Sequence, residues 1–221
     1  RNEAREILSA LVNDSVRHEI QVRAGYLLGF SEMDEPSSYT GGVARVRALL
    51  RANPEYRMSE NAARTFADRL LKAGDAAGAE DEYRRYFEAF PSAAMNASVI
   101  ERRGQALYML ARHSEAAGLF ARAEQLVEKL DDKSRFAYLQ ANAYLAEGKF
   151  VDAAASFERS ASYGGKDRNR SLYSQADALE RSGDVARASE IYEGLSASDD
   201  LWGQKANLRM VSIVARNGRL G

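Results

Sequence analysis

The sequence contains no cysteine and only two histidines, His18 and His113, in 221 residues. Disulfide bonds, thiolate metal sites and a cysteine nucleophile are therefore excluded, and so is a metal site built from several histidines. Neither sign of charge is in surplus, since the chain has 31 basic and 32 acidic side chains, and this balance argues against a nucleic-acid partner. No apolar run approaches the roughly 18 residues that span a bilayer, so we expect no membrane insertion.

Proline is also scarce, with three residues in the whole chain. Alanine, leucine, arginine and glutamate, by contrast, are abundant, and these residues lose little conformational freedom in a helix. The composition therefore predicts a chain that is nearly all helical.

Small and aromatic residues recur along the middle of the chain with a period of 35 to 37 residues. Each copy has a small residue, then glycine or alanine seven positions later, alanine after five more, and an aromatic residue after another four. Such a period is typical of repeat proteins, in which each repeat is one supersecondary unit. The four copies consist of Ala67, Gly74, Ala79 and Tyr83; Gly104, Ala111, Ala116 and Phe120; Ala141, Gly148, Ala153 and Phe157; and Ala176, Gly183, Ala188 and Tyr192.

Each position of this pattern has a mechanical role in a pair of antiparallel helices. Gly74, Gly148 and Gly183 stand where the first helix ends, and we predict a positive φ at each. The small residues let the two helices of one hairpin approach closely, and the aromatic side chains fill the space between hairpins. A single hairpin cannot bury its apolar face, so we expect the hairpins to stack.

Residues 104–120 and 141–157 resemble tetratricopeptide repeats almost residue by residue, and Pro91 stands where that family often ends the second helix. The style resembles repeat proteins of bacterial envelopes. The resemblance implies an all-α, right-handed α-solenoid of stacked antiparallel helix hairpins with about 11–12 helices.

We interpret residues 1–221 as one continuous solenoid. Residues 1–58 would form an N-terminal capping helix and an atypical repeat, in which Gly25 is the small residue and a polar loop at 31–38 adds five residues. Residues 59–195 would hold the four-repeat core. Residues 198–217 would form a C-terminal helix, which is either a cap or the start of a further repeat that turns at Gly218.

Apparent catalytic and metal-binding motifs have simpler interpretations. Gly164-Gly165-Lys166 is similar to part of a phosphate loop, but Arg159 replaces the required first glycine, so we expect an inter-repeat turn. We expect His113 to pack between helices, the acidic pair 131–132 to form a polar turn or a helix start, and the pair 199–200 to cap the last helix. The sequence thus predicts no catalytic residue, no metal and no cofactor.

The resemblance implies that the first helices line a concave groove where a partner binds. In this family the residues that contact the ligand lie three positions before, one position after and four positions after each small residue. Two arginines lie one helical turn before the first of these positions. These tyrosine, arginine and amide side chains suit a peptide segment. The predicted partner-binding residues are Arg64, Asp68, Glu101, Gln105, Tyr108, Arg135, Tyr138, Asn142, Arg170, Tyr173 and Asp177.

We therefore predict a non-enzymatic scaffold that binds another protein or a peptide, with a role in bacterial envelope assembly and a periplasmic location favoured over a cytoplasmic one. Chaperone-tail binding is not expected, because Tyr138 replaces a basic residue that this activity needs. Two alternatives stay open: a self-assembling array, in which the chain forms a homo-oligomer, and a regulatory or targeting segment of a longer multidomain protein.

Overall fold

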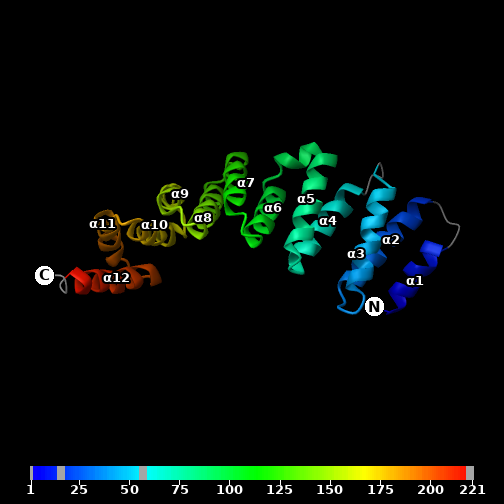
Figure 1. Cartoon of the computed structure of the whole chain (residues 1–221), viewed down its shortest axis with the longest axis horizontal. Coiled ribbons are helices and arrows are strands. Elements are labelled where there is room, and N and C mark those ends of the chain that lie inside the picture. The colour runs from blue at the N-terminus through cyan, green and yellow to red at the C-terminus, as the bar shows by residue number, and fades with distance from the viewer. Residues whose placement is uncertain (1, 14–17, 55–58, 218–221) are drawn as a thin grey trace. The chain divides into compact units, whose positions relative to one another are not determined.

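The computed structural model describes residues 2–13, 18–54 and 59–217, and these contain α-helices and one short 3-10 helix but no β-strand (Figure 1). The predicted all-α architecture of antiparallel helix hairpins is confirmed. The helices are α1 (Asn2–Asn13), α2 (His18–Met33), α3 (Tyr39–Ala52), α4 (Ser59–Lys72), α5 (Ala76–Ala89), the 3-10 helix η1 (Pro91–Met95), α6 (Ala97–Met109), α7 (His113–Leu126), α8 (Leu130–Ala146), α9 (Phe150–Ser162), α10 (Arg168–Ser182), α11 (Val185–Ser196) and α12 (Leu201–Asn217).

The chain divides into two compact units, Arg1–Ala93 and Ala94–Gly221. The first unit contains α1 to α5 and the second contains α6 to α12, and the boundary between Ala93 and Ala94 falls within η1. Each unit is built from helices that pack on their neighbours in sequence. A single solenoid that continues through both units stays a prediction.

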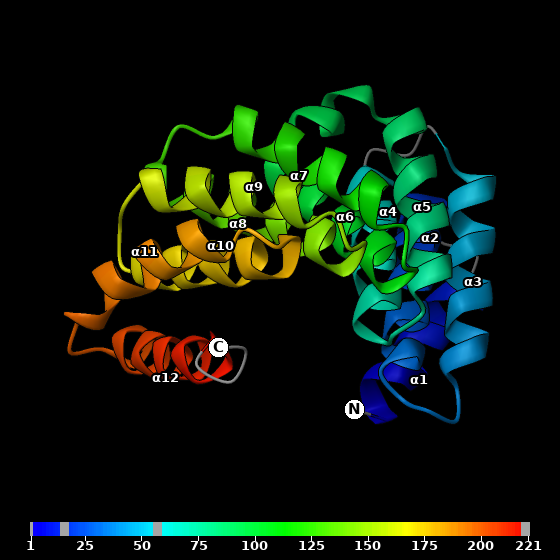
Figure 2. The same ribbon diagram turned by 60° about the vertical axis from the view of Figure 1, so that its left-hand side comes forward.

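The second unit contains three complete hairpins, α6/α7, α8/α9 and α10/α11, followed by α12. In both views α12 lies against α10 and α11 (Figures 1 and 2). The predicted aromatic residues Phe120, Phe157 and Tyr192 are each at most 2% exposed, and the alanines of the pattern surround them. This core fixes the register of the first helices, which carry most of the predicted binding residues.

The hairpin turns follow the prediction for glycine. Gly74, Gly148 and Gly183 have φ values of 86°, 77° and 94°, in the left-handed region that glycine adopts without steric cost. Ala111 occupies the same turn position of the α6/α7 hairpin with a φ of 57°. The turn geometry is thus the same in all four copies, although one copy lacks glycine.

In the first unit the α2/α3 hairpin differs from the prediction in its small residue. A Cβ atom on Gly42 would lie 2.5 Å from the backbone oxygen of Gly29, so these two glycines mark the closest approach of the helices. Gly25 instead lies against Leu49, one turn before Gly29 in α2. The spacing is therefore 13 residues rather than 17, close to the 12 of the later copies, and the assignment of Gly25 is wrong.

The predicted polar loop at 31–38 is also shorter than expected, because α2 continues to Met33. Arg5 of α1 contacts both the end of α2 and the turn after it: its guanidinium donates to Ser31 Oγ at 3.0 Å and pairs with Glu35 at 2.7 Å. The turn between α2 and α3, residues 34–38, is only two residues longer than the turn 147–149 between α8 and α9, so the predicted five-residue insertion is not present. His18 begins α2, where its exposed ring lies 2.9 Å from Asn53 Oδ1.

Helix α12 begins as predicted after the acidic pair 199–200. Asp200 Oδ1 accepts hydrogen bonds from the backbone N–H groups of Trp202 and Gly203 at 3.0 and 2.9 Å. A hydrogen bond from the Asn169 side chain, and then these backbone hydrogen bonds, lower the pKa of Asp200. The predicted apolar residues Leu208, Val211 and Val214 are exposed. Gly218 lies outside the described residues. Among the helices in residues 2–13, 18–54 and 59–217, none has the length and apolar character needed to cross a membrane.

Candidate binding face on the first helices

Nine of the predicted binding residues lie in the second unit, on the first helices α6, α8 and α10. All nine side chains are partly or fully exposed, so a partner can reach them. We call this set the first-helix face. It consists of Glu101, Gln105 and Tyr108 on α6; Arg135, Tyr138 and Asn142 on α8; and Arg170, Tyr173 and Asp177 on α10.

Cationic side chains join the first helices of successive hairpins. Arg135 of α8 forms an ion pair with Glu101 of α6. Arg170 of α10 lies over the ring of Tyr138 of α8, 4.3 Å from the ring centre, and its Nε donates to the tyrosine hydroxyl at 3.0 Å. In both cases the arginine lies one helical turn before the tyrosine of its own helix, Tyr138 or Tyr173, and its side chain contacts the first helix of the preceding hairpin.

The same arrangement continues onto α12, where none of the predicted binding residues lies. The ammonium group of Lys205 lies 6.0 Å from the ring centre of Tyr173 and 4.5 Å from that of Trp202. Arg135, Arg170 and Lys205 are spaced by 35 residues each, so the repeat period contains the signal. It was overlooked because the small residue that sets the register is replaced by Val211 in α12.

Core aromatic residues hold the two tyrosine rings from the inside. Tyr138 packs on Phe157 with ring centres 5.1 Å apart, and Tyr173 packs on Tyr192 at 5.5 Å. Burial raises the pKa of Tyr173, and it raises that of Tyr192 even more. Tyr173 and Tyr192 are therefore neutral at physiological pH. The contact with Tyr192 holds the half-buried ring of Tyr173 in one position toward the solvent.

The amide and acidic members of the face also have defined partners. Asn142 Nδ2 donates to the backbone oxygen of Tyr138 at 3.0 Å. Asp177 pairs with Arg181 at 2.9 Å and with Arg209 of α12 at 3.5 Å. These contacts orient the polar side chains before any partner binds.

Tyr108 lies apart from this series of cation–aromatic contacts. Its ring makes an edge-on contact with His113 at the α6/α7 turn, with ring centres 4.9 Å apart. The packing role predicted for His113 is therefore confirmed. Tyr108 is 38% exposed, so it can still contact a partner at the edge of the face.

The remaining two predicted residues, Arg64 and Asp68, lie on α4 in the first unit. Asp68 accepts a hydrogen bond from the hydroxyl of Tyr83, whose ring is fully buried. This contact gives Asp68 a structural task in its own hairpin. Arg64 and Asp68 stay predicted contacts.

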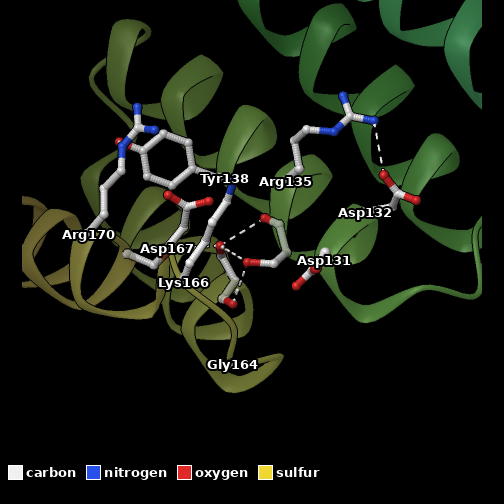
Figure 3. Close-up of a pocket in the computed structure, with 11 residues that line it drawn as sticks. Asp131, Asp132, Arg135, Tyr138, Gly164, Lys166, Asp167 and Arg170 are labelled. Atoms are coloured by element: carbon white, nitrogen blue, oxygen red, sulfur yellow. Dashed lines mark hydrogen bonds and ion pairs between the residues drawn. The ribbon is translucent and has the colours of Figure 1, made fainter.

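A pocket of about 320 Å³ opens beside Tyr138, between the first turns of α8 and α10 and the turn that precedes α10 (Figure 3). That turn contains Gly164 and Gly165, with φ values of 77° and 78°, so the predicted inter-repeat turn is confirmed. The sequence pattern contains no signal for this pocket, because the pocket forms where two separate repeats meet. Its lining includes Asp131, Asp132, Ser134, Arg135, Tyr138, Ser160, Gly164, Lys166, Asp167, Arg170 and Ser171.

Comparison with known proteins agrees with this architecture of stacked helix hairpins. Residues 138–200, which cover most of α8 to α11, match the family model described as tetratricopeptide repeat. The predicted resemblance to tetratricopeptide repeat proteins is therefore confirmed. A comparison with curated protein sequences gives no match.

Solved structures of low sequence identity share the fold. MamA from Desulfovibrio magneticus RS-1 is 12% identical and has a TM-score of 0.59, with 81% of this chain and 94% of that chain covered. A kinesin light chain-type protein of Podospora anserina with nearly identical TPR-like repeats is 14% identical, has a TM-score of 0.59, and covers 80% and 94%. PilF of Pseudomonas aeruginosa is 19% identical, with a TM-score of 0.53 and coverage of 91% and 88%. The tetratricopeptide repeat fold supports a scaffold for protein–protein interaction.

Proposed function

We propose that the chain is a non-enzymatic scaffold that binds a partner protein along the first-helix face of α6, α8 and α10. The observation that carries this proposal is the repeated pairing of a cation with the preceding hairpin, as in Arg170 on Tyr138 and Lys205 on Tyr173. Tyrosine and arginine are enriched among the residues that dominate binding energy at protein interfaces.

The geometry reduces what binding costs in lost side-chain freedom. Phe157 and Tyr192 already hold the inner sides of the two tyrosine rings, and Arg170 is fixed on Tyr138 by stacking and by a hydrogen bond. Side chains that are ordered before binding lose less entropy when the partner arrives. The face is therefore prepared for an extended or helical segment that lies across several first helices.

The charge of the chain also favours a protein partner over nucleic acid, because basic and acidic side chains balance. Arg64 and Asp68 are proposed contacts of the same kind on α4. A role in bacterial envelope assembly, self-association, and membership of a longer protein stay hypotheses.

Site-specific photo-crosslinking tests the proposal. A photoreactive phenylalanine analogue replaces Gln105 or Asn142 on the face, and Glu158 or Glu193 on the exposed sides of α9 and α11 serve as controls. In extracts of the source cells, we expect one partner to be captured at the first two positions and not at the controls.

Alanine variants of tyrosines on and off the first-helix face test which residues the captured partner contacts. Tyr138→Ala with Tyr173→Ala should reduce the capture about tenfold or more, as for a binding hot spot. Tyr163→Ala should leave capture unchanged, because Tyr163 lies at the end of α9, where its hydroxyl donates to Glu124 at 2.7 Å. Equal capture at all four crosslinking positions would contradict the proposal, and so would an equal loss of capture in the Tyr138/Tyr173 double variant and in Tyr163→Ala. Thermal melting confirms that each variant is folded.

A further inference from the structure

The pocket beside Tyr138, which we call the turn pocket, has a rigid floor of three serine hydroxyls. Ser160 and Ser171 are fully buried and Ser134 is 6% exposed. Ser160 Oγ donates to the backbone oxygen of Ser134 at 2.8 Å and lies 2.9 Å from Ser171 Oγ. Ser134 Oγ in turn donates to the backbone oxygen of Ser160 at 3.0 Å. The floor is therefore neutral and its hydroxyls are satisfied, so the charged rim determines what the pocket selects.

Two cations on the rim lack a carboxylate partner. Within the part of the chain that the structure describes, neither Lys166 nor Arg170 forms an ion pair. Arg170 is held on Tyr138, and Figure 3 shows the Lys166 side chain extending toward the same ring. The third cation, Arg135, is already neutralised by Glu101 and by Asp132, the latter at 3.6 Å.

The carboxylates of the pocket differ in how they can meet a ligand. Asp132 is engaged with Arg135. Asp131 lies against the turn, since a Cβ on Gly165 would be 2.7 Å from its Oδ1. Asp167 faces the two unpaired cations, with its carboxylate between Lys166 and Arg170 in Figure 3. It opposes an anion there, but it lies beyond ion-pair distance from both.

We propose that the turn pocket binds one acidic side chain, a glutamate or aspartate carboxylate, of the partner segment. This inference rests on the proposed function and names the chemistry that the partner must present. Lys166 and Arg170 hold the carboxylate, and the ring of Tyr138 packs on the methylene groups that carry it. A volume of about 320 Å³ is at the lower limit of ligand pockets, which range over about 300–1,000 Å³, and it suits one side chain rather than a longer segment.

The test uses a fluorescein-labelled peptide of alternating glutamate and glycine as the probe, with a glutamine–glycine peptide as its neutral control. Binding is followed by fluorescence anisotropy at low salt. Lys166→Gln and Arg170→Gln should each weaken binding about three- to fivefold, which corresponds to an exposed ion pair of up to about 1 kcal/mol. Asp167→Asn should instead strengthen binding about twofold, because it removes the opposing carboxylate.

A matched control variant distinguishes binding in the turn pocket from unspecific electrostatic attraction to the protein surface. Arg187→Gln removes one positive charge from the exposed side of α11, outside the pocket, and should leave the dissociation constant unchanged. An equal loss in Arg187→Gln would overturn the proposal in favour of unspecific attraction. Weaker binding in Asp167→Asn together with tighter binding in Lys166→Gln would overturn it in favour of a cation.

Competition with inorganic phosphate tests whether the turn pocket binds a phosphate group rather than a carboxylate. If phosphate displaces the peptide where chloride of equal ionic strength does not, the pocket is a phosphate site and the carboxylate assignment fails. If the crosslinking experiment fails while the peptide-binding variants still follow the expected order, that result would contradict the proposed function and leave the turn pocket as a site for acidic ligands. If crosslinking succeeds but the peptide-binding variants do not follow the expected order, the proposed function stands and the pocket proposal is wrong.

Discussion

The hairpins α6/α7 and α8/α9 use the same two small residue types in exchanged positions. In α8/α9 the helices cross at Ala141 and the chain turns at Gly148, whereas in α6/α7 they cross at Gly104 and the chain turns at Ala111. The turns nevertheless have similar geometry, with φ values of 77° at Gly148 and 57° at Ala111.

The exchange shows which requirement of the hairpin is stricter. A Cβ on Gly104 would lie 2.7 Å from the ring of Phe120, so the crossing in α6/α7 has no room for a methyl group. Ala111 tolerates the left-handed region at a cost of about 1–2 kcal/mol. In α6/α7 the backbone therefore accepts a strained turn at Ala111, whereas the packing around Gly104 does not accept an extra atom.

The largest effect should come from filling the α6/α7 crossing. We expect Gly104→Val to lower the free energy of unfolding by about 3 kcal/mol, because overpacking forces Phe120 out of its buried position. Urea denaturation measures the change. Gly118→Val is the matched control, since Gly118 is an exposed glycine of α7 with open space around it, and there valine should be neutral or slightly stabilising. Equal destabilisation by both variants would show that helix distortion, and not the crossing, is responsible.

Exchanging the turn residues should give smaller effects of opposite sign. Gly148→Ala should lower the free energy of unfolding by about 1 kcal/mol, because alanine is strained at a φ of 77°. Ala111→Gly should raise it by about 0.5 kcal/mol, because the relief of strain exceeds the entropy that glycine adds to the unfolded chain. The same denaturation measurements apply, and a destabilising Ala111→Gly would mean that the α6/α7 turn carries no strain.

The smallest effect concerns the polar contact between the two hairpins. Ser114 of α7 donates to the carboxylate of Glu147 at the end of α8, whose oxygens are 2.7 and 2.9 Å away, and Lys149 pairs with Glu147 at 3.2 Å. The hydrogen bond from Ser114, and then the Lys149 ammonium, lower the pKa of Glu147 below its ordinary value of 4.5. A lowered pKa means that the folded state favours the charged form, so the contribution is complete above pH 4.5 and is lost as the pH falls through the lowered pKa.

Glu147→Gln should therefore melt slightly below the unmodified protein at pH 7, and the difference should disappear in acid. Thermal melting across this pH range provides the measurement. Glu193→Gln serves as its control, as an exposed glutamate of α11. A difference in melting temperature that persists in acid would assign the effect to packing rather than to the charge of Glu147.

Much of the fold could be predicted because its signals are local. The positive φ at Gly148 and the buried ring of Phe157 each follow from a residue type at a fixed position in the repeat. The helix start after Asp200 follows from the capping preference of an acidic side chain. The α2/α3 hairpin could not be predicted in the same way. Both Gly25 and Gly29 lie on α2 one turn apart, and only packing against Gly42 shows which of them meets the second helix.

The candidate site, too, could be predicted only in part from the sequence. The positions of Tyr138, Tyr173, Arg135 and Arg170 follow from the repeat, so the sequence predicted which side chains line the first helices. Their partners depend on contacts between residues more than 30 positions apart, such as Arg170 with Tyr138 or Lys205 with Tyr173. The turn pocket likewise needs the first turn of α8 and the glycine turn before α10 to lie side by side.

The sequence alone determined the repeat period, the helical hairpin and the side chains presented by each first helix, because helix geometry translates spacing directly into position on a face. The tertiary structure decided which small residues touch, which charges neutralise one another and where a pocket remains. These outcomes depend on distances between separate helices, and a few tenths of an ångström there decide between contact and clash.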